Sequence, residues 1–483
     1  MDFMKYIRNV SVFIAFFLCV GNLFAQQLKI IVTGDMHGWI EPRAVEGKLF
    51  GGAAEMLAYW KAVEGYSPEK FLVIGCGDLA TGPAISTVYK GEPAIAVMNL
   101  MGYDVSALGN HEFDFGGSEG LKKMQQWAKF PIMAANVANA DGTPVDFIPP
   151  AMMYEEQGVK VGIIGLTLQN LASITSSNNI SGRPYAEYVR EFTAALREKG
   201  AKVIIVASHV PQAELCILAK EVADLNIPLM LGGHTHEISQ QKIGNTWVMS
   251  CGQWWECYGR IDLNFDPETG RSTVQLAKQV WLLQDRKDAQ SDPNVKADIG
   301  KWHEKVTKEH GESLGFTSSG LRRQWAICNL VTDSWLSRYP ADLAISNLGG
   351  FRQDLQPGEI RKLDFIGVMP FDNTLLRMKI SGEQLKNYIL TMKKEVLVFG
   401  GAKRKGDGMT ILKTDKAIDP ASGYSLLINS YLYGLSAELK TADPRPETVS
   451  EDWRDPVMEW LRKNPSSAEK PLEGAIDPSA RVE

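Results

Sequence analysis

The chain has 483 residues, of which 45% are hydrophobic and 22% charged, and its formal net charge at pH 7 is −6. This length is greater than one ordinary domain needs, so we expect two or three folding units of a globular rather than a disordered protein. The negative charge argues against a nucleic-acid polymer as the main partner, because that binding depends on lysine and arginine neutralising phosphates. Small phosphorylated metabolites remain compatible with this charge as ligands.

The first feature along the chain is an apolar stretch near the N-terminus. Lys5 and Arg8 precede residues 10–20, an apolar run too short for an ordinary transmembrane helix. We expect residues 1–25 to be a secretory signal peptide and the mature chain to be secreted or periplasmic. Lipid attachment at Cys19 is the alternative, which the bulky residues before it disfavour. No other apolar run is long enough to span a bilayer, so no membrane span is expected.

Short apolar runs with β-branched members follow, and each is a predicted strand: residues 28–32, 71–74, 203–206 and 228–231. Helix-like stretches lie between them, at residues 52–63, 92–101, 117–128, 185–199 and 213–223. This alternation predicts a layered α/β domain. In open α/β sheets, ligands bind beyond the carboxyl ends of the strands.

Five short motifs carry side chains that can bind metal ions through nitrogen or oxygen. Most of them come just after a predicted strand. The motifs are Asp35-Met-His37, Gly77-Asp78, Gly109-Asn110-His111-Glu112, Ser208-His209 and Gly233-His234-Thr-His236. Two divalent cations about 3.5 to 4 Å apart need a mixed imidazole and carboxylate shell, with one short anion touching both. Asp78 is the natural bridge. These ligand types do not select among Zn, Mn, Fe and Mg.

In this order the motifs resemble those of the calcineurin-like metallophosphoesterases. The longer string over residues 109–114, Gly-Asn-His-Glu-Phe-Asp, is similar to that of the 5′-nucleotidase family. Members of that family carry this catalytic domain followed by a C-terminal substrate-binding domain. The resemblance therefore implies an α/β fold, with a layered β-sandwich and flanking helices, plus a second α/β (α+β) domain.

The resemblance also implies roles for single residues. One metal would be held by Asp35, His37, Asp78 and His236, and the other by Asp78, Asn110, His209 and His234. His111 and Asp114 would be the catalytic pair, in which the histidine contacts the phosphoryl oxygen and the charge near the leaving group. A carboxylate beside an imidazole raises its pKa and orients the ring. A metal-bridging hydroxide would attack phosphorus in line.

Two motifs in the second half resemble the substrate-domain signatures of the same family. Residues 346–352 contain Asn-x-Gly-Gly-x-Arg, and residues 370–373 read Pro-Phe-x-Asn. The resemblance implies that Asn347 and Arg352 grip the substrate and that Phe371 stacks on the base. A guanidinium binds phosphate in bidentate fashion, and base stacking contributes about 1 to 3 kcal/mol. Arg323 is favoured over its neighbour as the upstream family arginine.

One segment departs from the family pattern. The family's second stacking aromatic stands in a segment that ends with Gly-Gly-Asp-Gly, whereas residues 429–435 here read Asn-Ser-Tyr-Leu-Tyr-Gly-Leu. Tyr431 is the expected second stacking residue. The missing glycines and aspartate leave the ribose contact without a predicted residue.

A polar break over residues 285–293 precedes a charged amphipathic helix over residues 294–310. We therefore expect a catalytic domain at 27–285, a linker helix at 286–315 and a substrate-binding domain at 316–483. By resemblance, the linker is the pivot that swings the second domain over the metals. Nothing in the sequence indicates an oligomeric state.

Five cysteines follow the expected signal peptide, an odd number that leaves at least one thiol free. Cys251 and Cys257 are the candidates for a disulfide. Trp254 and Trp255 are expected either in the core or in the wall of the cleft, and the core is favoured.

The predicted function is hydrolysis of nucleoside 5′-monophosphates to nucleoside and phosphate. Alternatives on the same scaffold are hydrolysis of the pyrophosphate of nucleotide sugars and hydrolysis of 2′,3′-cyclic nucleotides. A non-catalytic nucleotide or metal binder is a further alternative, which His111 and Asp114 argue against because a binder needs no leaving-group acid.

Overall fold

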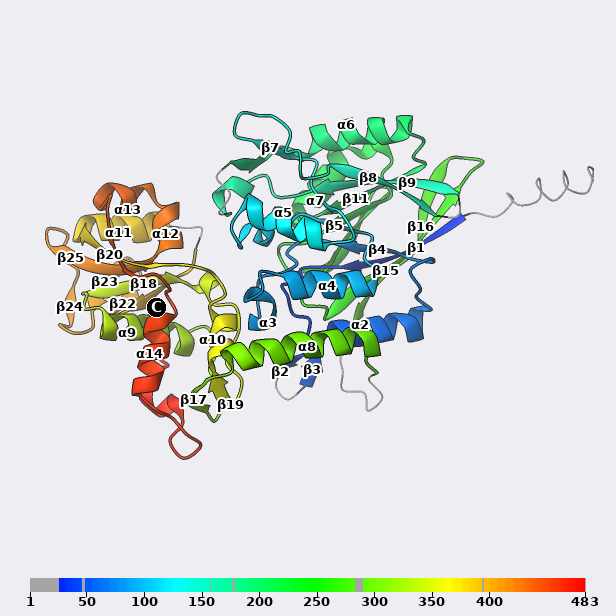
Figure 1. The fold of residues 1–483 in the computed structure, drawn as a ribbon. Coiled ribbons are helices and arrows are strands. Elements are labelled where there is room, and N and C mark those ends of the chain that lie inside the picture. The colour runs from blue at the N-terminus through cyan, green and yellow to red at the C-terminus, as the bar shows by residue number, and fades with distance from the viewer. Residues whose placement is uncertain are drawn as a thin grey trace, which may run out of the picture.

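The computed structural model of the chain describes residues 26–45, 48–156, 158–175, 179–282, 290–392 and 395–482. The expected signal peptide, and the first residues of the expected linker, lie outside this part of the chain. Figure 1 shows two bodies of mixed helix and strand, with helix α8 (Pro293–His310) reaching from one to the other.

The N-terminal body contains two six-stranded sheets. The order in the first is β16-β15-β1-β4-β5-β6, and in the second β13-β14-β12-β11-β9-β8. The first sheet consists of β1 (Gln26–Thr33), β4 (Leu72–Gly75), β5 (Val105–Ala107), β6 (Ile132–Met133), β15 (Cys257–Asp266) and β16 (Arg271–Trp281). The second consists of β8 (Ala151–Glu156), β9 (Val159–Leu166), β11 (Val203–Ser208), β12 (Leu229–Gly232), β13 (Ile238–Ile243) and β14 (Thr246–Cys251). Strands β1, β4, β5 and β6 are parallel, as are β9, β11, β12 and β14.

The two sheets pack face to face because successive side chains of each strand point to opposite sides. In β1, Ile30 and Val32 lie in the core between the sheets, whereas Ile31 faces the outer helices. In β11, Ile205 lies in the core between the sheets and Ile204 belongs to the outer core of the second sheet. Strands covered on both faces read as continuous apolar runs. For this reason the strands could be predicted from continuous apolar runs in the sequence.

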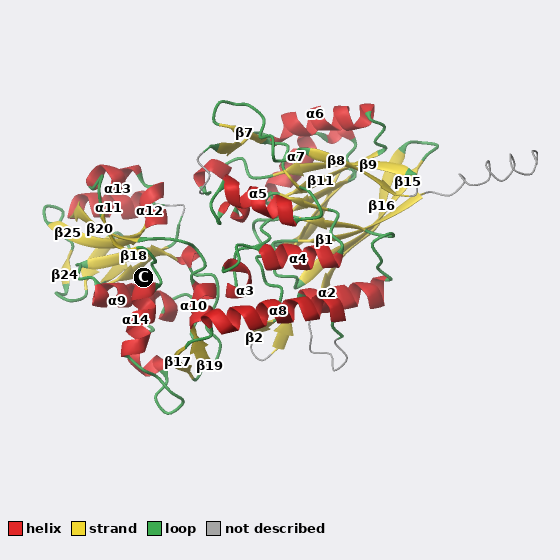
Figure 2. Ribbon diagram, viewed as in Figure 1, coloured by secondary structure: helices red, strands yellow, loops and turns green. Residues whose placement is uncertain are grey.

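Helices cover both outer faces of this sandwich, as Figure 2 shows. Those on the first sheet are α2 (Ala53–Tyr59), α4 (Glu92–Met101) and α5 (Ser118–Trp127), and those on the second are α6 (Tyr185–Glu198) and α7 (Gln212–Glu221). All five lie where the sequence predicts a helix, although the first continues as a π-helical turn over Trp60–Glu64. The layered α/β prediction is therefore confirmed. Smaller elements are α3 (Ala84–Thr87), β2 (Arg43–Val45), β3 (Lys48–Phe50), β7 (Val137–Asn139) and β10 (Ile180–Gly182).

Helix α8 is the predicted amphipathic helix. Its N-cap is Asp292, whose side chain accepts hydrogen bonds from the backbone N–H groups of Asn294 and Val295. Buried Val295 and Ile299 pack in the core that α2 and α4 share. None of the described helices is long and apolar enough to cross a membrane.

The C-terminal body is built on a five-stranded sheet with the order β21-β18-β25-β20-β26. Its strands are β18 (Leu343–Asn347), β20 (Leu375–Ser381), β21 (Leu397–Gly400), β25 (Gly423–Asn429) and β26 (Glu447–Ser450). Helices α9 (Ala326–Arg338) and α14 (Asp455–Lys463) cover one face, and α11 (Gly382–Thr391) and α13 (Ala437–Ala442) cover the other. The remaining elements are α10 (Lys362–Val368), α12 (Ser430–Leu435), β17 (Ser313–Thr317), β19 (Gly358–Arg361), β22 (Ala402–Lys405), β23 (Gly408–Ile411) and β24 (Lys416–Ala417).

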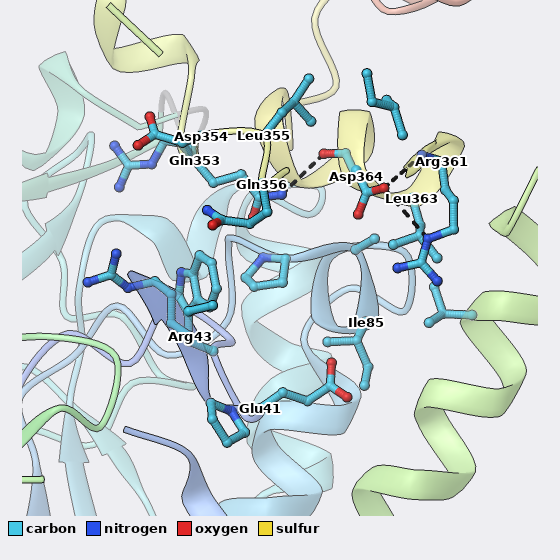
Figure 3. Close-up of a pocket in the computed structure, with 18 of the residues that line it drawn as sticks. Glu41, Arg43, Ile85, Gln353, Asp354, Leu355, Gln356, Arg361, Leu363 and Asp364 are labelled. Atoms are coloured by element: carbon cyan, nitrogen blue, oxygen red, sulfur yellow. Dashed lines mark hydrogen bonds and ion pairs between the residues drawn. The ribbon is translucent and has the colours of Figure 1, made fainter. Parts of the chain in front are cut away.

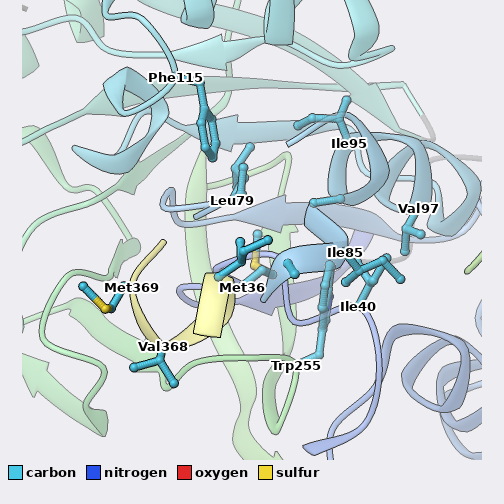
Figure 4. Close-up of a cluster of buried hydrophobic side chains, with 14 of the residues drawn as sticks. Met36, Ile40, Leu79, Ile85, Ile95, Val97, Phe115, Trp255, Val368 and Met369 are labelled. Atoms are coloured by element: carbon cyan, nitrogen blue, oxygen red, sulfur yellow. The ribbon is translucent and has the colours of Figure 1, made fainter. Parts of the chain in front are cut away.

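The two bodies meet through apolar side chains. Val368 and Met369, at the end of α10, belong to the same buried cluster as Met36 and Ile85 of the N-terminal body (Figure 4). Through this cluster the C-terminal end of α10 packs against the N-terminal body. Strand β17, which pairs with β19, begins at Ser313 and so occupies residues that the sequence assigned to the linker.

Candidate active site

The loops that follow the core strands carry every polar residue singled out in the N-terminal half. Asp35 and His37 follow β1, Asp78 follows β4, and His209 follows β11. Asn110 and His111 come after β5, and His234 and His236 come after β12. Neighbouring parallel strands end at the same edge of a sheet, so residues far apart in sequence meet at that edge.

Asp78 lies at the centre of this group. Its Oδ2 is 3.1 Å from His209 Nε2 and 3.6 Å from His37 Nε2. His209 Nε2 lies 3.2 Å from Asn110 Oδ1, and His37 Nε2 lies 3.0 Å from His236 Nε2. Three sets of side chains each place one ligand atom within 4.8 Å of the others: Asp35, His37 and His236; His37, Asp78 and His111; Asp78, His209 and His234. The seven ligand candidates are therefore together.

The backbone at this site adopts conformations that ordinary residues avoid. His37, Asp78, His234 and His236 have φ values of 49°, 52°, 72° and 58°. Positive φ costs about 1 to 3 kcal/mol for a residue with a side chain and persists where the surroundings enforce it. Four ligand candidates in this conformation mark the site as a constrained functional one, a feature that sequence patterns do not reveal.

Glu112 fixes two of these loops, and the sequence reading gave it no role. Its carboxylate is fully buried and accepts backbone hydrogen bonds from Asp78 at 3.1 Å, Leu79 at 2.6 Å and Gly109 at 2.6 Å. Burial raises the pKa of Glu112 to about 7. The motif over residues 109–112 contains this glutamate, so the signal was present, but only the fold shows that it holds the Asp78 turn.

The electrostatics fit divalent cations. Burial would raise the pKa of Asp78, but His209 and His111 hold it well below its usual range. Burial raises the pKa of Asp35 to about 7, and the buried Asp35 Oδ2 has no hydrogen-bond partner among the described residues. Burial also lowers the pKa values of His234 and His236, to about 4 and about 3. Neutral imidazoles and orphaned buried carboxylate oxygens are what metal ions bind.

His111 and Asp114 form a close pair beside this centre. His111 Nδ1 lies 2.6 Å from Asp114 Oδ2, and His111 Nε2 lies 4.0 Å from Asp78 Oδ2. Burial alone would lower the pKa of His111, but Asp114 and Asp78 raise it above its ordinary value. Asp114 accepts a hydrogen bond from Nδ1–H, so in the imidazolium form that the two carboxylates favour, the second proton lies on Nε2, which faces the ligand cluster.

Two predicted substrate residues of the C-terminal body reach the same place. The Phe371 ring stacks on His111, with centroids 5.8 Å apart and planes 26° apart. The Arg352 guanidinium lies 5.9 Å from the Phe371 ring centroid, and no carboxylate among the described residues forms an ion pair with it. Arg323 lines the same cavity as Arg352, whereas Arg322 is 74% exposed and lies 3.5 Å from Asp354.

The other two predicted substrate residues are joined by a residue that sequence reasoning missed. Glu395 accepts a hydrogen bond from Asn347 Nδ2 at 3.0 Å and one from the Tyr431 hydroxyl at 3.0 Å. Asn347 is itself buried, and its Oδ1 accepts from Asn429 Nδ2 at 3.0 Å. Burial and Glu395 raise the pKa of Tyr431.

Comparison with known proteins agrees with this geometry. Residues 28–237 match the family model of the calcineurin-like phosphoesterases, and residues 305–438 match that of the 5′-nucleotidase C-terminal domain. The chain belongs to the 5′-nucleotidase family. It is a metal-dependent phosphoester hydrolase.

Two relatives align along about three quarters of their length. The 5′-nucleotidase of Vibrio cholerae is 25% identical over 418 residues, which cover 75% of this chain and 75% of that protein. Protein UshA of Yersinia enterocolitica is 24% identical over 423 residues, covering 74% and 76%. The crystal structure of a 5′-nucleotidase precursor from Thermus thermophilus superimposes with a TM-score of 0.80 at 21% identity and covers 95% of this chain and 99% of the other.

Within this 5′-nucleotidase family fold, two sequence expectations need correction. Trp255 is a core residue as expected, and its Nε1 donates to the Tyr103 hydroxyl at 2.8 Å. Trp254, for which the sequence favours the core, is half-buried and lines a cavity instead. Its φ of 58° lies in the left-handed region, which bulky residues seldom adopt. Cys251 and Cys257 are buried thiols and are not joined in a disulfide.

Proposed function

We propose that the chain hydrolyses nucleoside 5′-monophosphates to nucleoside and phosphate with two divalent metal ions. The observation that carries this proposal is the position of His111. Its Nε2 faces the ligand cluster around Asp78, its Nδ1 is held by Asp114, and its ring is covered by Phe371 from the other body. A non-catalytic binder would have no use for this arrangement, because a proton donor serves only a departing group.

Asp78 is shared between two ligand sets in this proposal. Asp35, His37, Asp78 and His236 would hold one ion, and Asp78, Asn110, His209 and His234 the other. When bound, the two ions would supply an activated water and positive charge for the phosphoryl oxygens. Zinc, manganese, iron and magnesium all remain compatible with this mixed shell.

The residues of the chain itself position the substrate and move a proton. Arg352 has no carboxylate partner among the described residues and is free to bind phosphate oxygens in bidentate fashion. His111 Nε2 donates a proton to the leaving 5′ oxygen, while Asp114 keeps the other ring nitrogen protonated. Apolar Phe371 excludes water from one side of this proton transfer.

The nucleoside would lie on the C-terminal body, between Phe371 and the side chains of Asn347 and Tyr431. Glu395 supplies a carboxylate at this end, where the family's aspartate is missing. Nucleotide-binding proteins use acidic side chains to accept hydrogen bonds from ribose hydroxyls. Glu395 holds both Asn347 and Tyr431, so it is placed to serve this role.

We also assign the catalytic domain to residues 27–285 and the substrate-binding domain to the residues after α8. Strand β17 belongs with the second domain, since it pairs with β19. The basic start of the chain and the apolar run over residues 10–20 support export by a signal peptide.

A phosphate-release screen tests the proposed function. The purified chain would be treated with a chelator, reloaded separately with zinc, manganese, iron or magnesium, and assayed on the common nucleoside 5′-monophosphates. We expect release of one phosphate per nucleotide that is lost with chelator and restored by at least one ion. A fully metal-loaded protein that binds nucleotides without releasing phosphate would instead identify a binder.

A further inference from the structure

The loop that carries Phe371 has no regular structure of its own. Residues 369–374 connect α10 to β20 and form neither helix nor strand. Such a loop depends on contacts with other elements for its position, because its own backbone forms no helix or sheet ladder. A ring that stacks on a base binds more tightly when it is held in place beforehand, since ordering a side chain on binding costs affinity. The contacts that hold this loop therefore bear on substrate selection.

Arg454 holds this loop with its guanidinium. Nη1 donates to Met369 O at 3.3 Å and Nη2 donates to Asp372 Oδ1 at 3.1 Å, so one planar group spans the two sides of Phe371. Asp452 fixes the arginine in turn, because it accepts a hydrogen bond from Nε at 2.8 Å. The Arg454 side chain is charged but only 12% exposed. A guanidinium is planar and rigid, so it fixes the spacing of the acceptors that it joins.

Trp453 binds the same loop through two further hydrogen bonds. Its Nε1 donates to Phe371 O at 2.9 Å, and its backbone N–H donates to Asn373 O at 3.1 Å. The indole is fully buried. Residues 369–373 are therefore bound by one short turn, residues 452–454, which leads into α14.

Trp453 also contacts the other substrate motif. Its ring stacks on buried Phe351, with centroids 6.2 Å apart and planes 23° apart. It lies against the backbone of Gly350, where a Cβ atom would come within 3.0 Å of the indole. Glycine permits this close approach. A single indole thus touches the residues just before Arg352 and the loop of Phe371.

The two motifs are joined a second time at α10. The Arg352 N–H donates to Val368 O at 2.8 Å. Gln353 Nε2 donates to Asp364 O at 3.2 Å, and Figure 3 shows both residues in the wall of the cavity of about 560 Å³ that Arg352 also lines. Arg352 and Phe371 are therefore held at a set distance, and the guanidinium lies 5.9 Å from the ring centroid.

We propose that Arg454 and Trp453 are positioning residues for substrate recognition, which hold the Phe371 ring where it stacks on the base of a nucleotide. This inference rests on the proposed hydrolysis of nucleoside 5′-monophosphates and deepens it. Neither residue touches the substrate or moves a proton. They act on selection, because a set distance between the phosphate-binding Arg352 and the stacking ring favours a phosphate ester that carries a base over one that does not.

Two phosphate monoesters with the same 5′ leaving oxygen test this inference. Initial rates of phosphate release would be measured for adenosine 5′-monophosphate and for ribose 5-phosphate, which lacks the base, with the metal-loaded full chain. The ratio of the two kcat/KM values measures the contribution of the base. We expect the wild-type chain to prefer the nucleotide, and Phe371→Ala to lower the ratio about tenfold, the size of a lost stacking contact.

Arg454→Met should lower the same ratio about fivefold, because the ring then keeps only part of its stacking contact. Hydrolysis of ribose 5-phosphate should change little. When Arg454→Met is added to Phe371→Ala, the ratio should fall no further, since both changes act through one ring. Trp453→Phe removes the Nε1 donor and keeps a ring for Phe351. It should act in the same direction, and it is the second variant if Arg454→Met fails to fold.

Arg462→Met is the matched control. Arg462 lies in the last turn of α14, and its guanidinium pairs with Glu312 at 2.8 Å rather than with the Phe371 loop. The ratio should be unaltered in this variant.

Three results with the variants would overturn the inference. A ratio that is unaltered in Arg454→Met and Trp453→Phe would show that neither residue positions the ring. An equal loss on both substrates would show that they support the fold only. A double variant with a lower ratio than Phe371→Ala would show that Arg454 acts on the base by another route.

The wild-type chain separates this inference from the proposed function. Equal kcat/KM values for the nucleotide and ribose 5-phosphate would leave the phosphate-releasing activity intact but remove the base contact, and the inference with it. Hydrolysis of neither compound would refute the proposed function itself.

Discussion

The two halves of the candidate active site are built in different ways. The N-terminal half takes its residues from loops at the ends of parallel strands, and the buried register of those strands fixes where each loop begins. The C-terminal half depends on side-chain contacts, such as the bonds of Glu395 to Asn347 and Tyr431, and on how closely the two bodies approach.

This difference predicts different responses to mutation. A change at a strand-end ligand should weaken or empty the metal centre, because these side chains supply its charge and its donor atoms. A change in the C-terminal half should weaken or re-tune substrate binding while the metal centre stays intact. Mutations in the two halves should therefore separate metal binding from substrate binding.

Asp78→Asn should have the largest effect. Asp78 Oδ2 is the shared atom of the cluster, so loss of its charge should reduce the occupancy of both metal positions. Loss of several kcal/mol of charge stabilisation corresponds to at least about a thousandfold in turnover. Elemental analysis after gel filtration measures the metals. Asp104→Asn, at a half-buried aspartate that accepts from Val73 N at 2.8 Å, is the control. Two full equivalents of metal in Asp78→Asn would exclude a bridging role.

His111→Ala should keep both metals and lose at least about a hundredfold in kcat, the size typical of losing a general acid.

Asp114→Asn should shift the alkaline limb of the pH profile of kcat/KM to lower pH. The sign follows because Asp114 raises the pKa of His111, so the imidazolium survives to a higher pH with Asp114 than without it. His310→Ala changes a half-buried histidine that does not line the Arg352 cavity, and it serves as control. An alkaline limb that does not move in Asp114→Asn would contradict this pairing.

The strand-end half of the site could be predicted from sequence because its signals are local. Each apolar run ends a few residues before its ligand, and burial on both faces makes these strands continuous apolar runs that the sequence shows directly. The left-handed backbone of His37, Asp78, His234 and His236 could not be predicted, because φ is set by the packed loops rather than by residue type. The family resemblance supplied the pairing of these motifs into two ligand sets.

The C-terminal half was less predictable for a physical reason. Glu395 stands in no motif and becomes significant only because α11 and β21 bring it to Asn347 and Tyr431. For Trp254 the core was favoured over the wall of the cleft, and the structure places it in a cavity wall. Its place in the cavity wall depends on a strained turn and on Arg43 from another loop, and neither leaves a pattern in the sequence.

Arg352→Ala should raise KM for a nucleoside monophosphate about tenfold to a hundredfold and affect metal content little. Hydrogen bonds to charged groups contribute about 1.5 to 3 kcal/mol, and every 1.4 kcal/mol is tenfold in affinity. Arg323→Ala should act in the same direction, since it lines the same cavity. Arg322→Ala, at the exposed neighbour, is the control. If all three variants had the same KM, Arg352 and Arg323 would not bind the phosphate.

Glu395→Gln should have the smallest effect and the most specific one. Glutamine keeps an oxygen for the Tyr431 hydroxyl but removes the charge, so a ribose hydroxyl would lose a charge-assisted bond in favour of a neutral one. The difference between these bonds is about 1 kcal/mol, which predicts about a fivefold loss in the preference for ribonucleotides over 2′-deoxyribonucleotides. Competition assays with matched adenine nucleotides measure that ratio, and Glu383→Gln, in the exposed first turn of α11, is the control. An unaltered ratio together with a weaker affinity for both nucleotides would show that Glu395 only positions Asn347 and Tyr431. The ribose would then be bound by other groups.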